Sequence, residues 1–178
     1  MSEVTRRHKE KAPAKLRFAV FVCSTSRYQE LVGGREVDDE SGDLIEELLK
    51  QQGHTITLHR VIPDDRSLIE NSLKEALGSQ EIDAAIFCGG TGISPSDVTI
   101  ETVKPLLQRE LHGFGEIFRW LSYQTIGSAA VMTRAVAGVV DGKAVFCFPG
   151  SPQAVRLCLE KLILREAGHI ILHARGKG

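Results

Sequence analysis

Residues 82–92 read IDAAIFCGGTG, a short apolar run that passes directly into a glycine-rich loop. A continuous apolar run of this length is typical of a strand covered on both faces. The run RFAVFVC at residues 17–23 has the same character, and HTITLHRVI at residues 54–62 alternates like another strand. These three runs are predicted to be strands of the central sheet.

Helical segments separate the three runs. Apolar side chains recur every three or four positions in residues 41–52 and again in residues 65–77, and Gly53 stands where the first of these helices would end. The resulting β-α-β-α-β order predicts parallel strands, right-handed crossovers and helices on both faces of the sheet.

The second half of the chain continues this pattern with one reversal. Thr99 has the character of an N-cap for a helix over residues 100–110, in which Pro105 predicts a kink or an early end. A further amphipathic helix is expected over residues 114–126, with Phe118 and Trp120 in the core.

An Asp141-Gly142 pair joins two strand-like runs, residues 134–140 and 143–148. Such a pair is a strong hairpin signal, so one strand should run antiparallel to the others. Ser151 and Pro152 then begin a last helix, expected to end at Ala167, and residues 169–173 are a candidate final strand.

Composition limits the class of protein. The chain has 178 residues, the size of one domain, and a net charge of -1, which argues against a nucleic-acid binder held by bulk charge. No apolar run approaches the roughly 18 residues of a membrane helix, and the polar, basic start is unlike a secretory signal. We expect residues 1–15 to be a flexible basic arm and residues 16–178 a single cytoplasmic domain.

Four cysteines, Cys23, Cys88, Cys147 and Cys158, lack the spacing of a zinc site. We interpret them as buried free thiols of a reducing compartment rather than as nucleophiles. The chain contains 17 glycines, a larger fraction than is average for soluble proteins. Their positions in the sequence therefore bear on where backbone must turn tightly.

In open α/β sheets, ligands bind beyond the carboxyl ends of the strands. The predicted strands are followed there by Ser24 to Arg27, by Pro63 to Asp65, by Gly89 to Gly92 and by Pro149 to Pro152. The glycine loop could present backbone N–H groups to a phosphate, although glycine turns at strand ends are often only tight turns. It lacks the lysine of a Walker A loop.

Asp64 and Asp97 could converge near such a phosphate and hold Mg²⁺, which prefers one or two carboxylates plus phosphate oxygens. The alternative is that each caps the helix that follows it, although Asp65 is the better cap beside Asp64. Ser151 is either an ordinary N-cap or part of a second anion site. One face of the helix over residues 114–126 carries Glu116, Arg119 and Ser122. This face is either part of a binding site or simply exposed to solvent.

Three motifs in this order resemble one family: GGTG with DVT at residues 89–99, GFGE at 113–116 and PGSP at 149–152. The chain is similar, over roughly residues 17–168, to the MoaB/MogA family of molybdenum cofactor biosynthesis proteins, which includes the G domain of gephyrin. It looks closer to the MoaB branch. The resemblance implies a three-layer α/β molybdopterin-binding fold, mostly parallel with one antiparallel hairpin strand.

The family's reaction would be adenylylation of molybdopterin by Mg-ATP, with release of pyrophosphate. The resemblance assigns catalysis and Mg²⁺ to Asp64 and Asp97. It assigns nucleotide phosphates to Gly89, Gly90, Thr91, Gly92, Ser24 and Ser26. It assigns molybdopterin to Gly115, Glu116, Ser122, Pro149, Gly150, Ser151 and Pro152.

The sequence also departs from the family pattern. Ser96 replaces an arginine that usually precedes the loop aspartate, and Ser26-Arg27 replaces an acidic residue after the first strand, so Arg27 could supply a phosphate-facing charge. The resemblance further implies a homotrimer or homohexamer that could hand its product to a molybdate-insertion protein. Two alternatives remain: a non-catalytic molybdopterin carrier of the same fold, and a flavodoxin-like nucleotide module.

Overall fold

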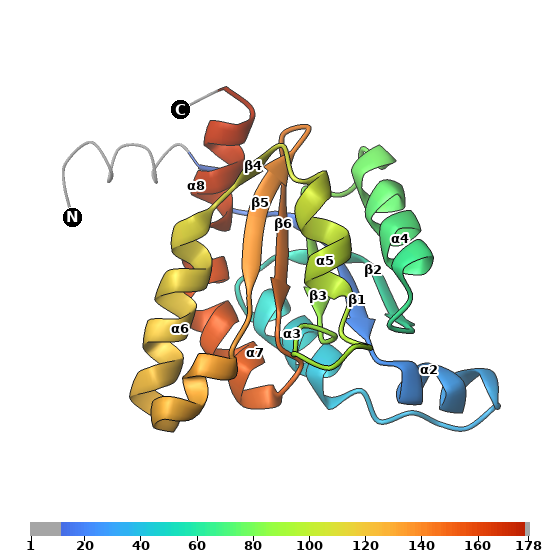
Figure 1. The fold of residues 1–178 in the computed structure, drawn as a ribbon. Helices are drawn as coiled ribbons and strands as arrows, with labels where there is room; N and C mark the ends of the chain where they lie inside the picture. Colours follow the sequence, from blue (N-terminus) through green and yellow to red (C-terminus); the bar gives the residue numbers. More distant parts are fainter. Residues whose placement is uncertain (1–11, 177–178) are drawn as a thin grey trace.

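Six strands form one mixed sheet in the computed structural model, which describes residues 12–176 (Figure 1). The strands are β1 (Arg17–Cys23), β2 (Thr55–Ile62), β3 (Ala84–Cys88), β4 (Arg109–Glu110), β5 (Val136–Val140) and β6 (Lys143–Phe148). Their order in the sheet is β2-β1-β3-β6-β5-β4. Strands β2, β1, β3 and β6 are parallel, and β5 pairs antiparallel with both of its neighbours.

Helices cover both faces of this sheet. They are α2 (Thr25–Val32), α3 (Glu40–Gln51), α4 (Arg66–Gly78), α5 (Thr99–Val103), α6 (His112–Ile126), α7 (Pro152–Cys158) and α8 (Leu164–Ala174). Two 3₁₀ turns, η1 (Lys104–Leu106) and η2 (Gly127–Met132), follow α5 and α6. A π-helical stretch, η3 (Leu159–Ile163), joins α7 to α8.

The side chains of the central strands alternate between two cores. Phe18, Val20 and Val22 of β1 pack on the side of α3, α6, α7 and α8. Phe21 and its neighbours Ala19 and Cys23 pack on the side of α4 and α5. Figure 1 shows the two helical layers on opposite sides of the sheet. The predicted three-layer fold, mostly parallel with one reversed strand, is therefore confirmed.

The strand order indicates where a ligand would bind to this sheet. The chain runs from β1 outward to β2 and then returns to β3 on the other side of β1, so the connections diverge between β1 and β3. Such a switch point opens a crevice at the carboxyl ends of the strands. The ends of β1 at Cys23 and of β3 at Cys88 lie on either side of it.

Two elements differ from the sequence prediction. The sequence prediction placed no helix between the first strand and residue 41, but residues 25–32 form α2, a helix with no buried residue. The last helical segment does not end at Ala167 but continues to Ala174, so residues 169–173 are helical rather than a strand. Ile163, Ala167 and Ile171 recur every four residues and are buried, which extends the apolar stripe of the helix past Gly168.

Helices α5 and α6 differ in how far they follow the sequence prediction. Pro105 does end its helix early: α5 stops at Val103, Pro105 lies in η1, and the next residues pair with β5 as the short strand β4. Phe118 is buried, as expected. The prediction that Trp120 lies in the core is wrong, because 60% of its surface is exposed. Phe114, Phe118 and Ser122 form the buried face of α6, and Trp120 lies on another face.

The cysteines are buried and free, as predicted. Burial raises the pKa of Cys23 to about 12 and that of Cys88 further still, so both remain protonated thiols and are poor nucleophiles at neutral pH.

Only the end of the predicted N-terminal arm lies within the described residues. Pro13 approaches α8 there, because a Cβ atom at Gly168 would lie 2.8 Å from the Pro13 carbonyl oxygen. Leu16 is buried, and its N–H donates to His54 Nδ1 at 3.1 Å. Residues 1–11 lie outside the described part, so the arm stays a prediction. Among residues 12–176, no helix is suited to crossing a membrane.

Candidate active site

Four loops meet at the carboxyl edge of the sheet. They follow β2, β1, β3 and β6, which are neighbours in this order, and they carry Asp64, Ser24, the glycine loop Gly89 to Gly92 and Pro149 to Pro152. The structure thus brings together the four segments that the sequence pointed to. What each side chain does there depends on its contacts.

The first two residues of the glycine loop adopt backbone conformations that exclude other residues. Gly89 has φ of 101° and Gly90 has φ of 59°. A Cβ atom at Gly89 would overlap the Cys23 carbonyl oxygen, and one at Gly90 would overlap both Asp64 Oδ1 and Thr99 Oγ1. The fold itself therefore requires both glycines, and the loop lies directly against Asp64.

Thr99 fastens this loop to α5. Its N–H donates to the Gly90 carbonyl at 3.0 Å and its hydroxyl donates to the Gly89 carbonyl at 2.9 Å. The prediction that Thr99 is the N-cap of the helix is wrong, because Thr99 is the first residue of α5 and no side chain caps this helix. Its side chain is used instead to fix the glycine turn.

Asp64 is not a helix cap. Its Oδ2 accepts hydrogen bonds from the Thr25 N–H at 3.0 Å and the Thr25 hydroxyl at 2.8 Å. Asp65 caps α4 by accepting from the Leu68 N–H at 2.9 Å, as the sequence suggested. Asp64 Oδ1 is shielded from solvent and has no hydrogen-bond partner in the described residues. A buried carboxylate oxygen without a partner is costly, which marks this atom as a site for a cation or donor.

Asp97 approaches the same loop from the other side. Its Oδ2 accepts from the Ser94 N–H at 2.8 Å, within a turn closed by Asp97 N–H donating to the Ser94 carbonyl at 2.9 Å. A Cβ atom at Gly92 would lie 2.8 Å from Asp97 Oδ2. Asp97 does not cap α5 either. One carboxylate thus lies at Gly90 and the other at Gly92.

This donor set fits Mg²⁺ that is shared with a substrate. The described residues hold no group of three or more side chains able to bind a metal. Mg²⁺ commonly takes one or two protein carboxylates and completes its shell with phosphate oxygens and water. The unpartnered Asp64 Oδ1, at Gly90, and the Asp97 carboxylate, at Gly92 of the same loop, are oxygens that could serve such an ion.

The end of β1 contributes a short polar turn. Ser24 caps α2 by accepting from the Arg27 N–H at 3.5 Å, and the Ser24 and Ser26 hydroxyl oxygens are 3.3 Å apart. Arg27 Nη1 lies 3.5 Å from Asp39 Oδ1. Arg27 is therefore held close to the site by a carboxylate that the sequence prediction did not include.

A pocket of about 100 Å³ opens beside the end of β6. It is lined by Ser122, Thr133, Pro149 and Ser151, among others. Ser151 caps α7 by accepting from the Ala154 N–H at 3.3 Å, and Pro152 is the first helical residue. The buried Ser122 hydroxyl donates to the Phe118 carbonyl at 2.8 Å. Ser122 and two residues of the PGSP turn, Pro149 and Ser151, thus line one pocket.

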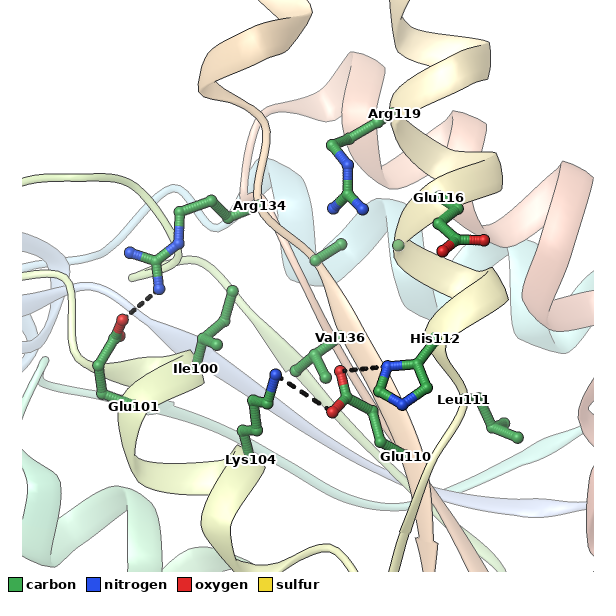
Figure 2. A pocket seen from close by; sticks show the side chains of 12 residues that line it. Ile100, Glu101, Lys104, Glu110, Leu111, His112, Glu116, Arg119, Arg134 and Val136 are labelled. Atoms are coloured by element: carbon green, nitrogen blue, oxygen red, sulfur yellow. Dashed lines mark hydrogen bonds and ion pairs between the residues drawn. The ribbon is translucent and has the colours of Figure 1, made fainter.

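Gly115 and Glu116 line a different pocket. It has about 480 Å³ and lies between α5, α6 and the start of β5, with Lys104, Arg119 and Arg134 among its walls (Figure 2). The predicted molybdopterin residues are therefore not gathered in one pocket. Ser122, Pro149 and Ser151 line the pocket beside β6, Gly115 and Glu116 line this larger one, and Pro152 lines a third, between α3 and α7. Gly115 has a structural reason of its own, because a Cβ atom there would lie 2.7 Å from the Ala135 carbonyl oxygen.

Arg134 links this larger pocket to the glycine loop. Its Nη1 donates to the Gly92 carbonyl at 3.0 Å, and its Nη2 pairs with Glu101. Arg134 and Thr25 were not among the predicted site residues. The sequence offered no local signal for Arg134, because its partner Gly92 lies 42 residues earlier.

Comparison with known proteins identifies the family of this chain. The family described as "Probable molybdopterin binding domain" matches residues 19–169. The chain belongs to this family. It is 43% identical over 164 residues to "Molybdenum cofactor biosynthesis protein B" of Bacillus anthracis, a match that covers 92% of this chain and 93% of the relative. It is 41% identical to "Probable molybdopterin adenylyltransferase" of Methanocaldococcus jannaschii, covering 90% and 94%.

Solved structures of the family share the fold. The "tungsten cofactor synthesizing protein MoaB" of Pyrococcus furiosus superposes with a TM-score of 0.81 at 40% identity, covering 92% of this chain and 99% of that one. A structure of MogA superposes with a TM-score of 0.76 at 27% identity, covering 89% and 99%. The higher identity to MoaB confirms the predicted closeness to that branch.

Proposed function

We propose that this protein takes part in molybdenum cofactor biosynthesis by transferring the adenylyl group of Mg-ATP to molybdopterin. The names of its relatives support the pathway and the reaction. The observation in the molecule that carries the proposal is the Asp64 carboxylate, whose buried and unpartnered Oδ1 faces Gly90 of a glycine loop. Asp97 approaches the same loop at Gly92.

In this reaction, an oxygen of the terminal phosphate of molybdopterin attacks the α-phosphorus of ATP. A new P–O bond forms, the bond between the α-phosphorus and the bridging oxygen to the β-phosphate breaks, and pyrophosphate leaves with that oxygen. Phosphoryl and nucleotidyl transfers depend mainly on positioning and charge neutralisation, so no covalent nucleophile is needed. This agrees with the four buried, protonated cysteines.

Each part of the site has a role in the proposal. Mg²⁺ would neutralise phosphate charge, and Asp64 and Asp97 would hold it. Gly89, Gly90, Thr91 and Gly92, with Ser24 and Ser26, would bind the nucleotide phosphates. Ser122, Pro149 and Ser151, which line the pocket beside β6, would bind molybdopterin together with Gly150 and Pro152 of the same turn. Gly115 and Glu116 lie in the larger pocket, from which they would act next to this site rather than in it.

The decisive experiment measures pyrophosphate release from Mg-ATP with and without molybdopterin. Asp64→Asn and Asp97→Asn should each reduce turnover about 100-fold or more, because each replaces a charged magnesium ligand by a neutral amide. Asp65→Asn is the matched control. Asn also caps helices well, so this variant should keep both its stability and near-normal turnover.

Near-normal turnover of both Asp64→Asn and Asp97→Asn would contradict the assignment of these residues. A wild-type protein that binds molybdopterin but releases no pyrophosphate would instead be a molybdopterin carrier. Flavin absorbance in the purified protein would support the nucleotide-module alternative.

The proposal extends to the assembly of the protein, its location and the fate of its product. We expect a homotrimer or homohexamer, since apolar side chains stay exposed on α6 and the following turn: Ile117, Trp120, Tyr123, Ile126, Val131 and Met132. We expect a cytoplasmic location, where ATP is available. The adenylylated product would pass to a protein that inserts molybdate.

A further inference from the structure

A buried serine outside the predicted site contacts it directly. Ser41, in the first turn of α3, is completely buried. Its hydroxyl donates to the Gly150 carbonyl at 2.6 Å, although the two residues are 109 positions apart in the sequence. Gly150 is the second residue of the PGSP turn that follows β6.

The turn that carries Ser41 is held from several directions. Asp39 caps α3 by accepting from the Gly42 N–H at 3.2 Å. Asp39 Oδ2 is in turn 3.1 Å from His59 Nε2 of β2, and Asp39 Oδ1 pairs with Arg27. A Cβ atom at Gly42 would overlap both Asp39 and His59. These contacts hold the backbone of the turn, and the buried Ser41 hydroxyl is its donor to Gly150.

Gly150 lies between the two halves of the site. A Cβ atom at Gly150 would lie 3.3 Å from Gly89 Cα, so the turn packs against the glycine loop. Its neighbours Pro149 and Ser151 line the pocket that also contains Ser122. A change in the Gly150 peptide would alter the spacing between the proposed phosphate and molybdopterin positions.

The peptide between Gly150 and Ser151 is trans, since the described residues contain no cis peptide bond. In a trans peptide the C=O and the N–H point in opposite directions. The hydrogen bond from Ser41 therefore also sets the direction of the Ser151 N–H, away from α3. Without the hydroxyl, the Gly150 carbonyl would lose this donor and the peptide could rotate.

We propose that Ser41 is a positioning residue for nucleotidyl transfer: its hydroxyl fixes the Gly150 peptide, and with it the distance between the glycine loop and the Ser122 pocket. Ser41 touches neither substrate in this scheme and acts through Gly150. The inference rests on the proposed function, because it concerns how two substrates are aligned for that reaction.

The test compares Ser41→Ala with Ser72→Ala. Ser72 is also buried, but it lies on α4, on the opposite face of the sheet. In Ser41→Ala, kcat for pyrophosphate release should fall about 10-fold while the KM for ATP changes less than about twofold, because misalignment affects the reacting geometry more than binding. In Ser72→Ala, kcat should stay within about twofold of wild type, whatever the change in Tm.

Amide hydrogen exchange provides a second readout that does not depend on activity. Ser41→Ala should increase exchange in the segments 89–92 and 149–151, and Ser72→Ala should leave both unchanged. An unchanged kcat in Ser41→Ala, or unchanged exchange in these segments, would overturn the proposal. If the wild-type protein releases no pyrophosphate, the proposed function fails. Exchange and the affinity for molybdopterin then decide whether Ser41 orders this turn.

Discussion

At the scale of single residues, Gly90 leaves the space that the Asp64 carboxylate occupies at the site. Gly90 has a positive φ and leaves no room for a Cβ atom between Asp64 Oδ1 and Thr99 Oγ1. Gly90→Ala should therefore displace the Asp64 carboxylate and abolish most turnover. It should also lower the free energy of unfolding by about 1–2 kcal/mol, the usual cost of a left-handed conformation for a residue with a Cβ.

Gly78→Ala is a suitable control for this prediction. Gly78 ends α4, and a Cβ atom there would meet nothing within 4 Å. This variant should be as stable as wild type or slightly more stable, with unchanged turnover. The measurements are urea unfolding and pyrophosphate release. Normal turnover of Gly90→Ala would show that the loop tolerates displacement of Asp64, contrary to the proposed arrangement.

Capping rules, applied to the sequence, chose the right residue at Asp65 and the wrong one at Thr99. The choice between Asp64 and Asp65 followed from capping rules, and the structure confirms that Asp65 is the cap. Prediction from sequence also failed where the partner is distant along the chain. The contacts of Ser41 with Gly150 and of Arg134 with Gly92 span 109 and 42 residues, and neither leaves a periodic or motif signal.

At the scale of elements, α6 has two apolar faces. Phe114 and Phe118 pack into the core, while Ile117, Trp120 and Tyr123 are exposed. If the exposed face forms a contact between subunits, Trp120→Glu should dissociate the assembly, because a charge would be buried against apolar side chains. Sedimentation should then show a smaller species with unchanged circular dichroism, since Trp120 contributes little to the core.

Leu68→Glu is the control for this change. Leu68 is an exposed apolar residue on α4, 42% accessible, and lies outside the α6 face. It should leave the sedimentation coefficient unaltered. A wild-type protein that sediments as a monomer, or a Trp120→Glu variant that keeps the size of the wild-type assembly, would contradict a subunit contact through α6.

Prediction of elements from sequence depended on burial. The strands β1, β3 and β6 are buried along almost their whole length, and their apolar runs located them correctly. Helix α2 has no buried residue, so it left no apolar periodicity to detect. For residues 169–173, a short apolar run was compatible with either a strand or a helix. Packing of Ile171 against the core, continuous with Ile163 and Ala167, determined the helix.

At the scale of the whole molecule, the edge of the sheet opposite the site joins the two ends of the domain. Asp83, just before β3, pairs with Arg17 at the start of β1 and with Arg175 after α8. Arg17 also pairs with the exposed Glu81. Burial alone would raise the pKa of Asp83, but hydrogen bonds from Arg17 and Arg175 lower it to about 2.

This lowered pKa makes the stability of the domain depend on pH. A carboxyl group with a pKa of about 2 in the folded state and about 3.9 in the unfolded state contributes its full stabilisation above about pH 4 and loses it as the pH falls toward 2. Asp83→Asn removes that contribution. At pH 7 it should lower the free energy of unfolding by about 2 kcal/mol, in the range of hydrogen bonds to charged groups.

The difference between wild type and Asp83→Asn should therefore shrink between about pH 4 and pH 2, as the wild-type carboxylate becomes protonated. Urea unfolding at a series of pH values measures it. Glu81→Gln is the control, because Glu81 is 73% exposed and its ion pair with Arg17 should contribute little. A difference that stays constant from pH 7 to pH 2 would mean that the charge of Asp83 does not stabilise the join between the two ends of the domain.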